Sequence, residues 1–334
     1  MTSEELIQRE LKFKKDYDQL VELYDVVFEN ELSNMGTTAT QVLKEMKSIL
    51  PIMKVMGIFS KKYRHIMDGY VYTHDDKIIA ATTVSTWNMK DWEIAMVATS
   101  PEYRRRGLGR KLVNKSIEHA KKHKAEMCYL EVLHDNEPAY NLYSDLGFVQ
   151  YDSVAKYLLD LNNLPTDMQN EQLPEDYSLK EFKRTKKTSN EKYELEIKSK
   201  SELSEQFMPT DKSQFKNTLV KKILRPIVGK IFGMKFNQEL IYFKDQLVAT
   251  LFVNIKQKEE DITGIDLIVD KAHEQILAKP LIDYALNMIN EAETASNKAL
   301  ITINASNEKL IEVVEEYNFK QIELNHYLGL KLKK

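Results

Sequence analysis

Hydrophobic and polar residues follow two different periods along the chain, which predicts alternating strands and helices. Residues 92–99 alternate and are mostly apolar, as in a strand with one well-buried face. Residues 111–123 carry apolar side chains three and four positions apart, which predicts an amphipathic helix. Residues 127–133 predict another strand, 138–145 another helix, and 11–13 a short opening strand. This alternation indicates an α/β layer architecture.

The same pattern occurs twice along the sequence. The repeats pair residues 77–81 with 246–250, 136–148 with 307–319, and the apolar stretches 155–159 with 326–330. A nearly constant offset over separated places indicates a duplicated domain. The polar segment 161–174 contains two prolines and has the composition of a linker. We therefore predict one domain over residues 1–160 and a second over residues 175–334.

Composition narrows the class of protein. A hydrophobic share of 43% with 30% charged residues is typical of a soluble globular chain. The charged N-terminus predicts no signal peptide, and no apolar run reaches the length of a membrane span. One cysteine, Cys128, excludes an intramolecular disulfide and suits a reducing compartment. With a net charge of −3, we expect a cytoplasmic protein without nucleic-acid or membrane partners.

The histidines give no sign of a metal site in the sequence. They show no ligand spacing with cysteines or carboxylates, which predicts surface or packing roles for His65, His74, His119, His123 and His134. We therefore expect no bound metal. Cys128 is expected to be a small buried hydrophobic residue.

Residues 96–112 have the strongest chemical pattern, because a predicted strand passes through a loop into a helix N-terminus. The loop reads Arg104-Arg105-Arg106-Gly107-Leu108-Gly109. The first N–H groups of a helix lack intrahelical acceptors, and the helix dipole places about half a positive charge there. Glycines let the backbone approach a phosphate closely, and arginines add positive charge. The alternative is an ordinary turn before a helix.

This loop resembles the acetyl-CoA signature of the GNAT superfamily, Gln/Arg-x-x-Gly-x-Gly/Ala, with Arg104, Gly107 and Gly109 in its three defined places. The second signature of that family follows at the proper distance, as Asn136, Ala139, Tyr143 and Gly147-Phe148. The resemblance covers about residues 5–160. Leu130-Glu131-Val132 is similar to the corresponding strand of ribosomal-protein N-terminal acetyltransferases. The resemblance implies two tandem GNAT-type domains, each a mixed, mostly antiparallel twisted sheet flanked by helices.

The resemblance also implies how acetyl-CoA, the acyl donor, would be held. Backbone groups of Val97, Ala98 and Thr99 would bind the acetyl carbonyl and the pantetheine amides. Arg104 would add charge, and the pyrophosphate would be cradled by the amides of Arg105, Arg106, Gly107, Leu108, Gly109 and Arg110. Asn136 would meet the pantetheine arm, and Tyr143 would lie beside the thioester sulfur.

Acyl transfer to an amine needs a proton acceptor for the amine and a proton donor for the leaving thiolate. The resemblance makes Glu131 the candidate base, acting directly or through a water, and Tyr143 the candidate acid. By spacing alone, Tyr143 could equally be a core aromatic residue of its helix, and Glu131 a solvated residue of a half-buried strand.

The second half lacks most of these residues. Ile276 stands in the place of Gly107, and Glu274 in that of Arg105. A β-branched side chain hinders backbone approach to a phosphate, and a carboxylate repels it. In the second half, Thr302 and Val314 stand in the places of Glu131 and Tyr143. Of these residues only Asn136 is retained, as Asn307. We expect a degenerate, non-catalytic domain, in an architecture that resembles mycothiol synthase.

The predicted function is acetyl transfer from acetyl-CoA to an amine, which could be a protein N-terminus, a polyamine or a small amine. The alternative is a non-catalytic acyl-CoA-binding or scaffold protein. Residues 46–67 and 212–238 contain basic but no acidic side chains. These segments could be solvated helix faces, a groove for an acidic acceptor or partner, or a membrane contact. A homodimer is left open.

Overall fold

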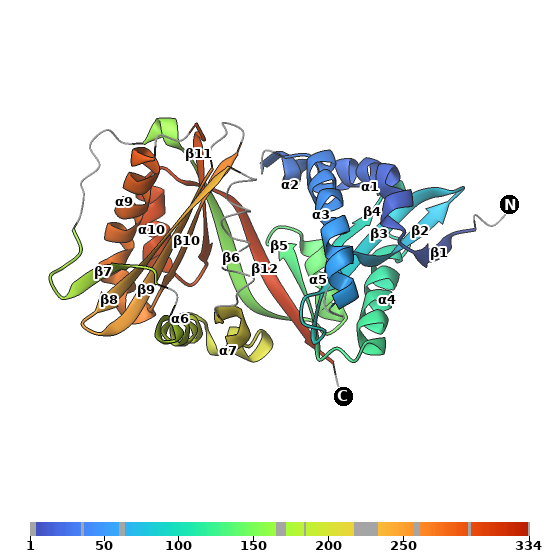
Figure 1. Ribbon diagram of the computed structural model, residues 1–334. Helices are drawn as coiled ribbons and strands as arrows, with labels where there is room; N and C mark the ends of the chain where they lie inside the picture. Colours follow the sequence, from blue (N-terminus) through green and yellow to red (C-terminus); the bar gives the residue numbers. More distant parts are fainter. Residues whose placement is uncertain are drawn as a thin grey trace. The chain divides into compact units, whose positions relative to one another are not determined.

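The computed structural model describes residues 5–34, 37–59, 64–164, 172–183, 185–216, 233–256, 261–292 and 295–332 (Figure 1). Parts of the two basic segments, residues 60–63 and 217–232, lie outside these ranges. Among the described helices, none combines the length and the apolar character that crossing a membrane requires. The chain forms two compact units, Met1–Tyr151 with His326–Lys334 and Asp152–Asn325.

The first unit is a sheet with helices on both faces. Its strand order is β1-β2-β3-β4-β5-β12; neighbours from β1 to β4 are antiparallel, and β4 and β5 are parallel. The strands are β1 (Ile7–Glu10), β2 (Asp68–His74), β3 (Lys77–Thr86), β4 (Asp91–Thr99), β5 (Met127–Leu133) and β12 (Lys320–Lys331). The helices are α1 (Phe13–Val27), α2 (Glu29–Asn34), α3 (Ala39–Phe59), η2 (Pro101–Tyr103), α4 (Leu108–Lys122) and α5 (Glu137–Asp145).

Each face of this sheet has its own core. Leu20, Tyr24 and Leu43 of α1 and α3 pack against Val71, Ile78, Ala81 and Ala98 of the strands. Val113 and Ile117 of α4 pack on the other face, together with Trp92, Leu130 and Tyr143. Figure 1 shows α1 and α3 on the opposite side of the strands from α4. The amphipathic pattern of residues 111–123 thus buries one face of α4.

The second unit has the same architecture. Its strand order is β6-β11-β10-β9-β8-β7, with the single parallel pair between β10 and β11. The strands are β6 (Val149–Asp160), β7 (Tyr177–Glu181), β8 (Met234–Phe243), β9 (Gln246–Lys256), β10 (Ile262–Val269) and β11 (Lys298–Asn304). The helices are η3 (Leu161–Asn163), α6 (Lys186–Ser199), α7 (Glu202–Phe207), η4 (Lys212–Phe215), η5 (Lys271–His273), α9 (Glu274–Glu291) and α10 (Glu308–Glu316). The predicted fold class, a mostly antiparallel mixed sheet flanked by helices in each of two repeats, is confirmed.

The last strand of each sequence half completes the other unit. β6 pairs antiparallel with β11, and Ala155, Tyr157 and Leu159 are buried in the core of the second unit. β12 neighbours β5, and Leu328 and Leu332 are buried in the core of the first unit. The predicted division into 1–160 and 175–334 describes the duplicated sequence, whereas the compact units follow this exchange of strands. Two strands of the same alternating pattern can take each other's place, so the sequence pattern does not distinguish the two pairings.

The opening strand is displaced from its predicted position. It spans Ile7–Glu10 rather than residues 11–13, because Phe13 already begins α1 and is buried under it. Asp16 fixes this junction: its carboxylate accepts hydrogen bonds from the Arg9 guanidinium at 2.7 and 2.8 Å and from the Lys12 amide at 2.7 Å. Burial alone would raise the pKa of Asp16, but these partners outweigh it and lower the pKa.

Candidate active site

The parallel strands β4 and β5 pair over only three residues and then separate. The pairs join Asp91–Glu93 to Met127–Tyr129. On its other side β4 stays paired with β3, but a bulge between Ala95 and Ala98 inserts one extra residue, and Met96 has a φ of +52°. The pairing groups of β4 that face β5 beyond Glu93 are therefore available to a ligand that enters between the strands.

The predicted carbonyl-binding residues lie on this separated part of β4. Val97 packs against the core beneath α4, and Ala98 against the core beneath α1 and α3. The Thr99 carbonyl accepts a hydrogen bond from Arg104 Nε at 3.2 Å, so the end of the strand is tied to the loop that follows it. The structure brings these residues to the edge of the gap between β4 and β5.

The loop after β4 leads into an exposed helix N-terminus. Gly107 is the N-cap residue of α4, with a φ of +74° in the left-handed region, and no described side chain caps this end of the helix. A Cβ atom at Gly107 would meet nothing within 4 Å, so packing inside the protein does not require a glycine here. The glycine allows the left-handed backbone conformation and the close approach of a ligand from solvent. Leu108 is buried under the loop and anchors it. The first amides of α4 are thus arranged as an anion site.

The four arginines of this loop and helix are exposed. Arg105 has a φ of +65°, which turns the loop before Gly107. The Arg106 guanidinium lies 5.0 Å above the Tyr103 ring. Arg110 forms a 2.7 Å ion pair with Asp145 of α5. These positive groups surround the helix N-terminus, where a pyrophosphate would bring negative charge.

Asn136 has a structural contact besides its predicted role. It is the N-cap of α5, where its side-chain oxygen accepts a hydrogen bond from the Ala139 amide at 3.2 Å. This contact fixes the start of α5 next to the end of β5.

Tyr143 lies on α5 and is buried against the face of β5 that carries Leu130 and Val132. Its ring meets Phe148 edge to face, with 6.1 Å between centroids. Burial, with a smaller contribution from the charge of Glu31, raises the pKa of Tyr143 to about 12. The phenol therefore keeps its proton at neutral pH and can offer it in a hydrogen bond.

Glu131 lies on the other face of β5, because strand residues alternate and its neighbours Leu130 and Val132 face Tyr143. It is exposed. The charges of Glu131 and of Glu93 both act on Tyr129, which stands opposite Glu93 at the last β4–β5 pair. The two carboxylates thus flank the point where the strands separate.

Glu93 is a candidate base that the sequence signatures do not identify. Burial raises the pKa of Glu93, although a 3.2 Å hydrogen bond from Ser85 Oγ partly opposes this. The alternation of residues 92–99 places Glu93 on the other face of the strand from buried Trp92 and Ile94. Only its pairing with Tyr129 locates Glu93 where β4 separates from β5. A raised pKa beside a cleft is typical of proton-transfer groups.

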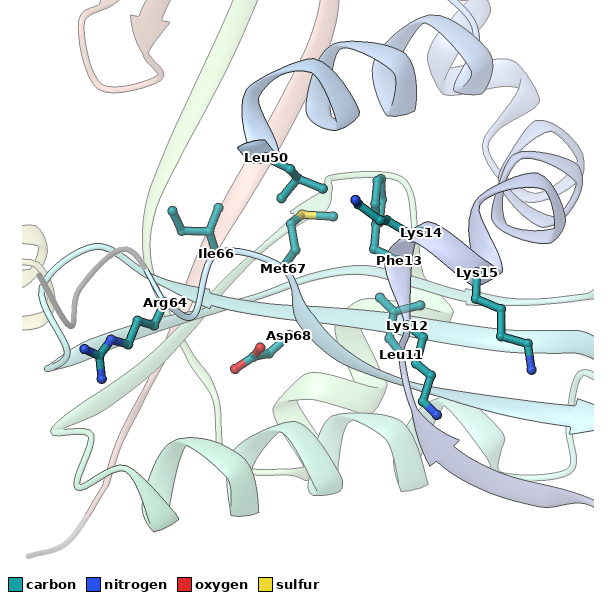
Figure 2. Close-up of a pocket in the computed structure, with 10 residues that line it drawn as sticks. All are labelled: Leu11, Lys12, Phe13, Lys14, Lys15, Leu50, Arg64, Ile66, Met67 and Asp68. Atoms are coloured by element: carbon teal, nitrogen blue, oxygen red, sulfur yellow. The ribbon is translucent and has the colours of Figure 1, made fainter. Parts of the chain in front are cut away.

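A pocket of about 410 Å³ opens beside β2 and the start of α1 (Figure 2). Lys12, Lys14 and Lys15 lie on one side and Arg64 on the other, with Asp68 between them. Asp68 of β2 pairs with Val84 of β3, which in turn pairs with Ile94 of β4. Ile94 follows the last residue of β4 that pairs with β5. A basic pocket at this level suits an acceptor with negative charge near its amine.

The corresponding region of the second unit has a different chemistry. β10 and β11 also pair briefly, over Ile262–Ile265. Glu274 begins α9, is buried, and accepts hydrogen bonds from the amides of Lys309 and Leu310 at 3.1 and 3.2 Å. A carboxylate of the chain itself thus caps the start of α10. Glu274 also places a carboxylate in the first turn of α9, the counterpart of α4, and Ile276 stands in the place of Gly107, so this helix start lacks the features of an anion site.

Comparison with known proteins agrees with this geometry. Residues 54–148 match the acetyltransferase (GNAT) family. An N-alpha-acetyltransferase of Sulfurisphaera tokodaii is 37% identical over 73 residues, which are 22% of this chain and 44% of that protein. N-alpha-acetyltransferase 30 of Schizosaccharomyces pombe is 39% identical over 67 residues, 20% of this chain and 45% of that protein. The chain thus spans less than half the length of these curated relatives.

Two solved structures resemble almost the whole chain. A GCN5-related N-acetyltransferase from Sphaerobacter thermophilus has a TM-score of 0.66 at 12% identity, over 98% of this chain and 96% of its own. A tandem GNAT protein from the clavulanic acid biosynthesis pathway has a TM-score of 0.59 at 14% identity, over 99% of both chains. Residues 54–148 therefore resemble the acetyltransferase (GNAT) family, and the whole chain has a fold similar to that of these two structures.

Proposed function

We propose that this protein is an N-acetyltransferase that moves the acetyl group of acetyl-CoA to a free α-amine, at a peptide N-terminus or on a small molecule. The observation that carries the proposal is the gap between β4 and β5, which opens directly toward the uncapped N-terminus of α4. A ligand with amides along one part and phosphates at one end fits the backbone groups of β4 and the amides after Gly107.

The two faces of β5 supply the two proton transfers. Tyr143, on one face, donates a proton to the departing thiolate, whose pKa is roughly 8.5 by analogy with cysteine. Glu131, on the opposite face, accepts the proton of the attacking amine directly or through a water. The backbone N–H groups of β4 at the bulge stabilise the oxyanion as the amine attacks the carbonyl.

The choice of an α-amine follows from the free-base fraction of the acceptor. An amine with a pKa of about 8 is about one tenth free base at pH 7, whereas a lysine near 10.4 is free in about four parts in ten thousand. An exposed carboxylate such as Glu131 accepts the proton of an amine with a pKa of about 8 more readily than that of a lysine. The two relatives named above as N-alpha-acetyltransferases support the same choice.

A non-catalytic acyl-CoA-binding protein is the alternative. Binding alone requires neither a protonated phenol beside the gap nor carboxylates at the point where the strands separate. We infer that the second unit binds no acetyl-CoA, because Glu274 places a carboxylate in the first turn of α9, the counterpart of α4, and Ile276 replaces Gly107.

Isothermal titration should find one acetyl-CoA per chain. Gly107→Val should weaken binding by about 10²-fold or more, because a β-branched residue is strained at a φ of +74° and its side chain stands where the phosphates approach. Circular dichroism should report an unchanged fold. Ile276→Gly is the control and should leave binding as it is; two equivalent sites per chain would contradict the assignment.

Tyr143→Phe should lower kcat by about 10²-fold while the affinity for acetyl-CoA changes little, because the hydroxyl acts only when the thiolate leaves. The variant keeps the buried ring and its contact with Phe148. Steady-state release of free thiol measures kcat, and titration measures binding. An unchanged kcat would make Tyr143 a packing residue.

Glu131→Gln should lower kcat/KM by about 10²-fold and shift its pH dependence upward. Without the base, only the amine that is already deprotonated reacts, so the rate follows the amine pKa of about 8. Glu93→Gln is the comparison, since it removes the second carboxylate near Tyr129. A large loss in Glu93→Gln together with normal activity in Glu131→Gln would assign the base to Glu93.

A panel of acceptors tests the reaction itself. Peptides with free N-termini, followed by acidic or basic residues, should release thiol from acetyl-CoA. Peptides with blocked N-termini and free lysines, and polyamines, should react at least tenfold more slowly, from their smaller free-base fraction. Thiol release only with lysines or polyamines would overturn the α-amine assignment, and no release with any amine would favour the binding protein.

A further inference from the structure

Three of the five histidines that the sequence leaves ungrouped come together at the end of α4 that lies far from the acyl-CoA loop. His65, His119 and His123 each offer a ring nitrogen, and these atoms lie within 4.8 Å of one another. Asp68 joins them: its Oδ2 is 2.6 Å from His65 Nδ1 and 3.2 Å from His119 Nε2. These histidines show no ligand spacing along the sequence, and the fold nevertheless brings three of them together.

The fold explains why the sequence hides the cluster. His119 and His123 are four residues apart on the last turn and C-cap of α4, so their side chains share one face of the helix. His65 and Asp68 lie just before and at the start of β2. The four residues meet because β2 and α4 pack together through Tyr70 and Leu112.

The ring geometry is close to that of a metal site. The ring centroids of His65 and His123 lie 4.4 Å apart, those of His119 and His123 4.8 Å, and those of His65 and His119 6.2 Å. Around one tetrahedral zinc ion, with Zn–N bonds of about 2.0–2.1 Å, ligand nitrogens lie about 3.4 Å apart and ring centroids about 5 Å apart. The ring nitrogens, which lie within 4.8 Å of one another, would have to approach to this spacing by rotation of the rings.

His119 has the hydrogen bonding expected of a metal ligand. Its Nδ1 lies 2.9 Å from the Tyr70 hydroxyl. Its Nε2 is buried and, despite its nearness to Asp68, makes no aligned hydrogen bond with any described residue. An outer partner on one ring nitrogen fixes the ring and presents the other nitrogen to a metal.

The charges of the cluster favour a cation. Asp68 adds a carboxylate oxygen, which lies 2.6 Å from His65 Nδ1 and 3.2 Å from His119 Nε2. Nitrogen donors select zinc and similar divalent transition metals over magnesium and calcium.

We propose that His65, His119, His123 and Asp68 bind one zinc ion. Four protein ligands close the coordination sphere, as in structural sites. Along α4, His119 lies about 16 Å from Leu108 at 1.5 Å per residue, so the ion is remote from the helix N-terminus proposed for the phosphates. It would join the start of β2 and the segment before it, which line the basic pocket through Asp68 and Arg64, to the end of α4.

Zinc uptake by the tag-free full chain tests the proposal. After treatment with a chelator, equilibrium dialysis against micromolar zinc should give one ion per chain, and cobalt should give the visible absorption of a tetrahedral site. His119→Ala and His123→Asn should each weaken zinc binding by about 10²-fold, and Tyr70→Phe by about tenfold through the lost outer partner. Circular dichroism of each variant checks its fold, and His134→Ala, on an exposed histidine, is the matched control.

Trp92 gives a second readout, because its ring centroid lies 5.2 Å from those of His119 and His123. In a Trp87→Phe background, cobalt should quench the remaining tryptophan fluorescence in parallel with its uptake, and His123→Asn should abolish the quenching. The proposal is overturned if the folded wild-type chain takes up no zinc, or if uptake is the same in His119→Ala and His123→Asn as in His134→Ala.

Discussion

The candidate site depends on the early end of the pairing between two parallel strands. A parallel pair usually continues for the length of its strands, and buried backbone groups need hydrogen-bond partners. Here the pairing stops after Glu93 and Tyr129, and the bulge at Met96 turns the next residues of β4. A ligand that supplies its own amides can satisfy the groups left unpaired. The loop that ends at Gly107 then places a helix N-terminus at one end of the gap, and β5 places Tyr143 and Glu131 on its two sides.

The second unit illustrates what the fold requires without the ligand. β10 and β11 keep the short parallel pairing, so this feature belongs to the fold. The carboxylate of Glu274 gives α10 an internal cap, which contributes about 0.5–2 kcal/mol in typical helices and needs no bound anion. Glu274 also places its carboxylate in the first turn of α9, the counterpart of α4, whereas the first turn of α4 holds no acidic side chain and its amides can meet phosphate oxygens. The difference between the two copies therefore lies in the charge at the start of the helix that follows the loop.

Local structure could be predicted from the sequence, and pairings between distant segments could not. The Gly107 loop, β5 and α5 lie where the sequence places them, because each is set by short-range periodicity and by glycine at a left-handed position. The strand at residues 155–159 was also predicted, but its partner β11 was not, since either copy offers the same alternating pattern. Glu93 and the cluster of His65, His119 and His123 depend on register and on the packing of β2 against α4. No spacing along the chain reports those contacts.

The exchange of strands also explains why the second half matters to the first unit whether or not it binds a ligand. Leu328 is fully buried beside Trp92 and Leu130, in the core that also holds Tyr143. Truncating one such leucine to alanine typically costs about 2–5 kcal/mol, which is a large part of the stability of a domain. A chain that ended at residue 160 would therefore expose the core behind β5 and loosen the ring of Tyr143. The second half can lose every residue of the anion site and still be required, because the last strand of the first unit comes from it.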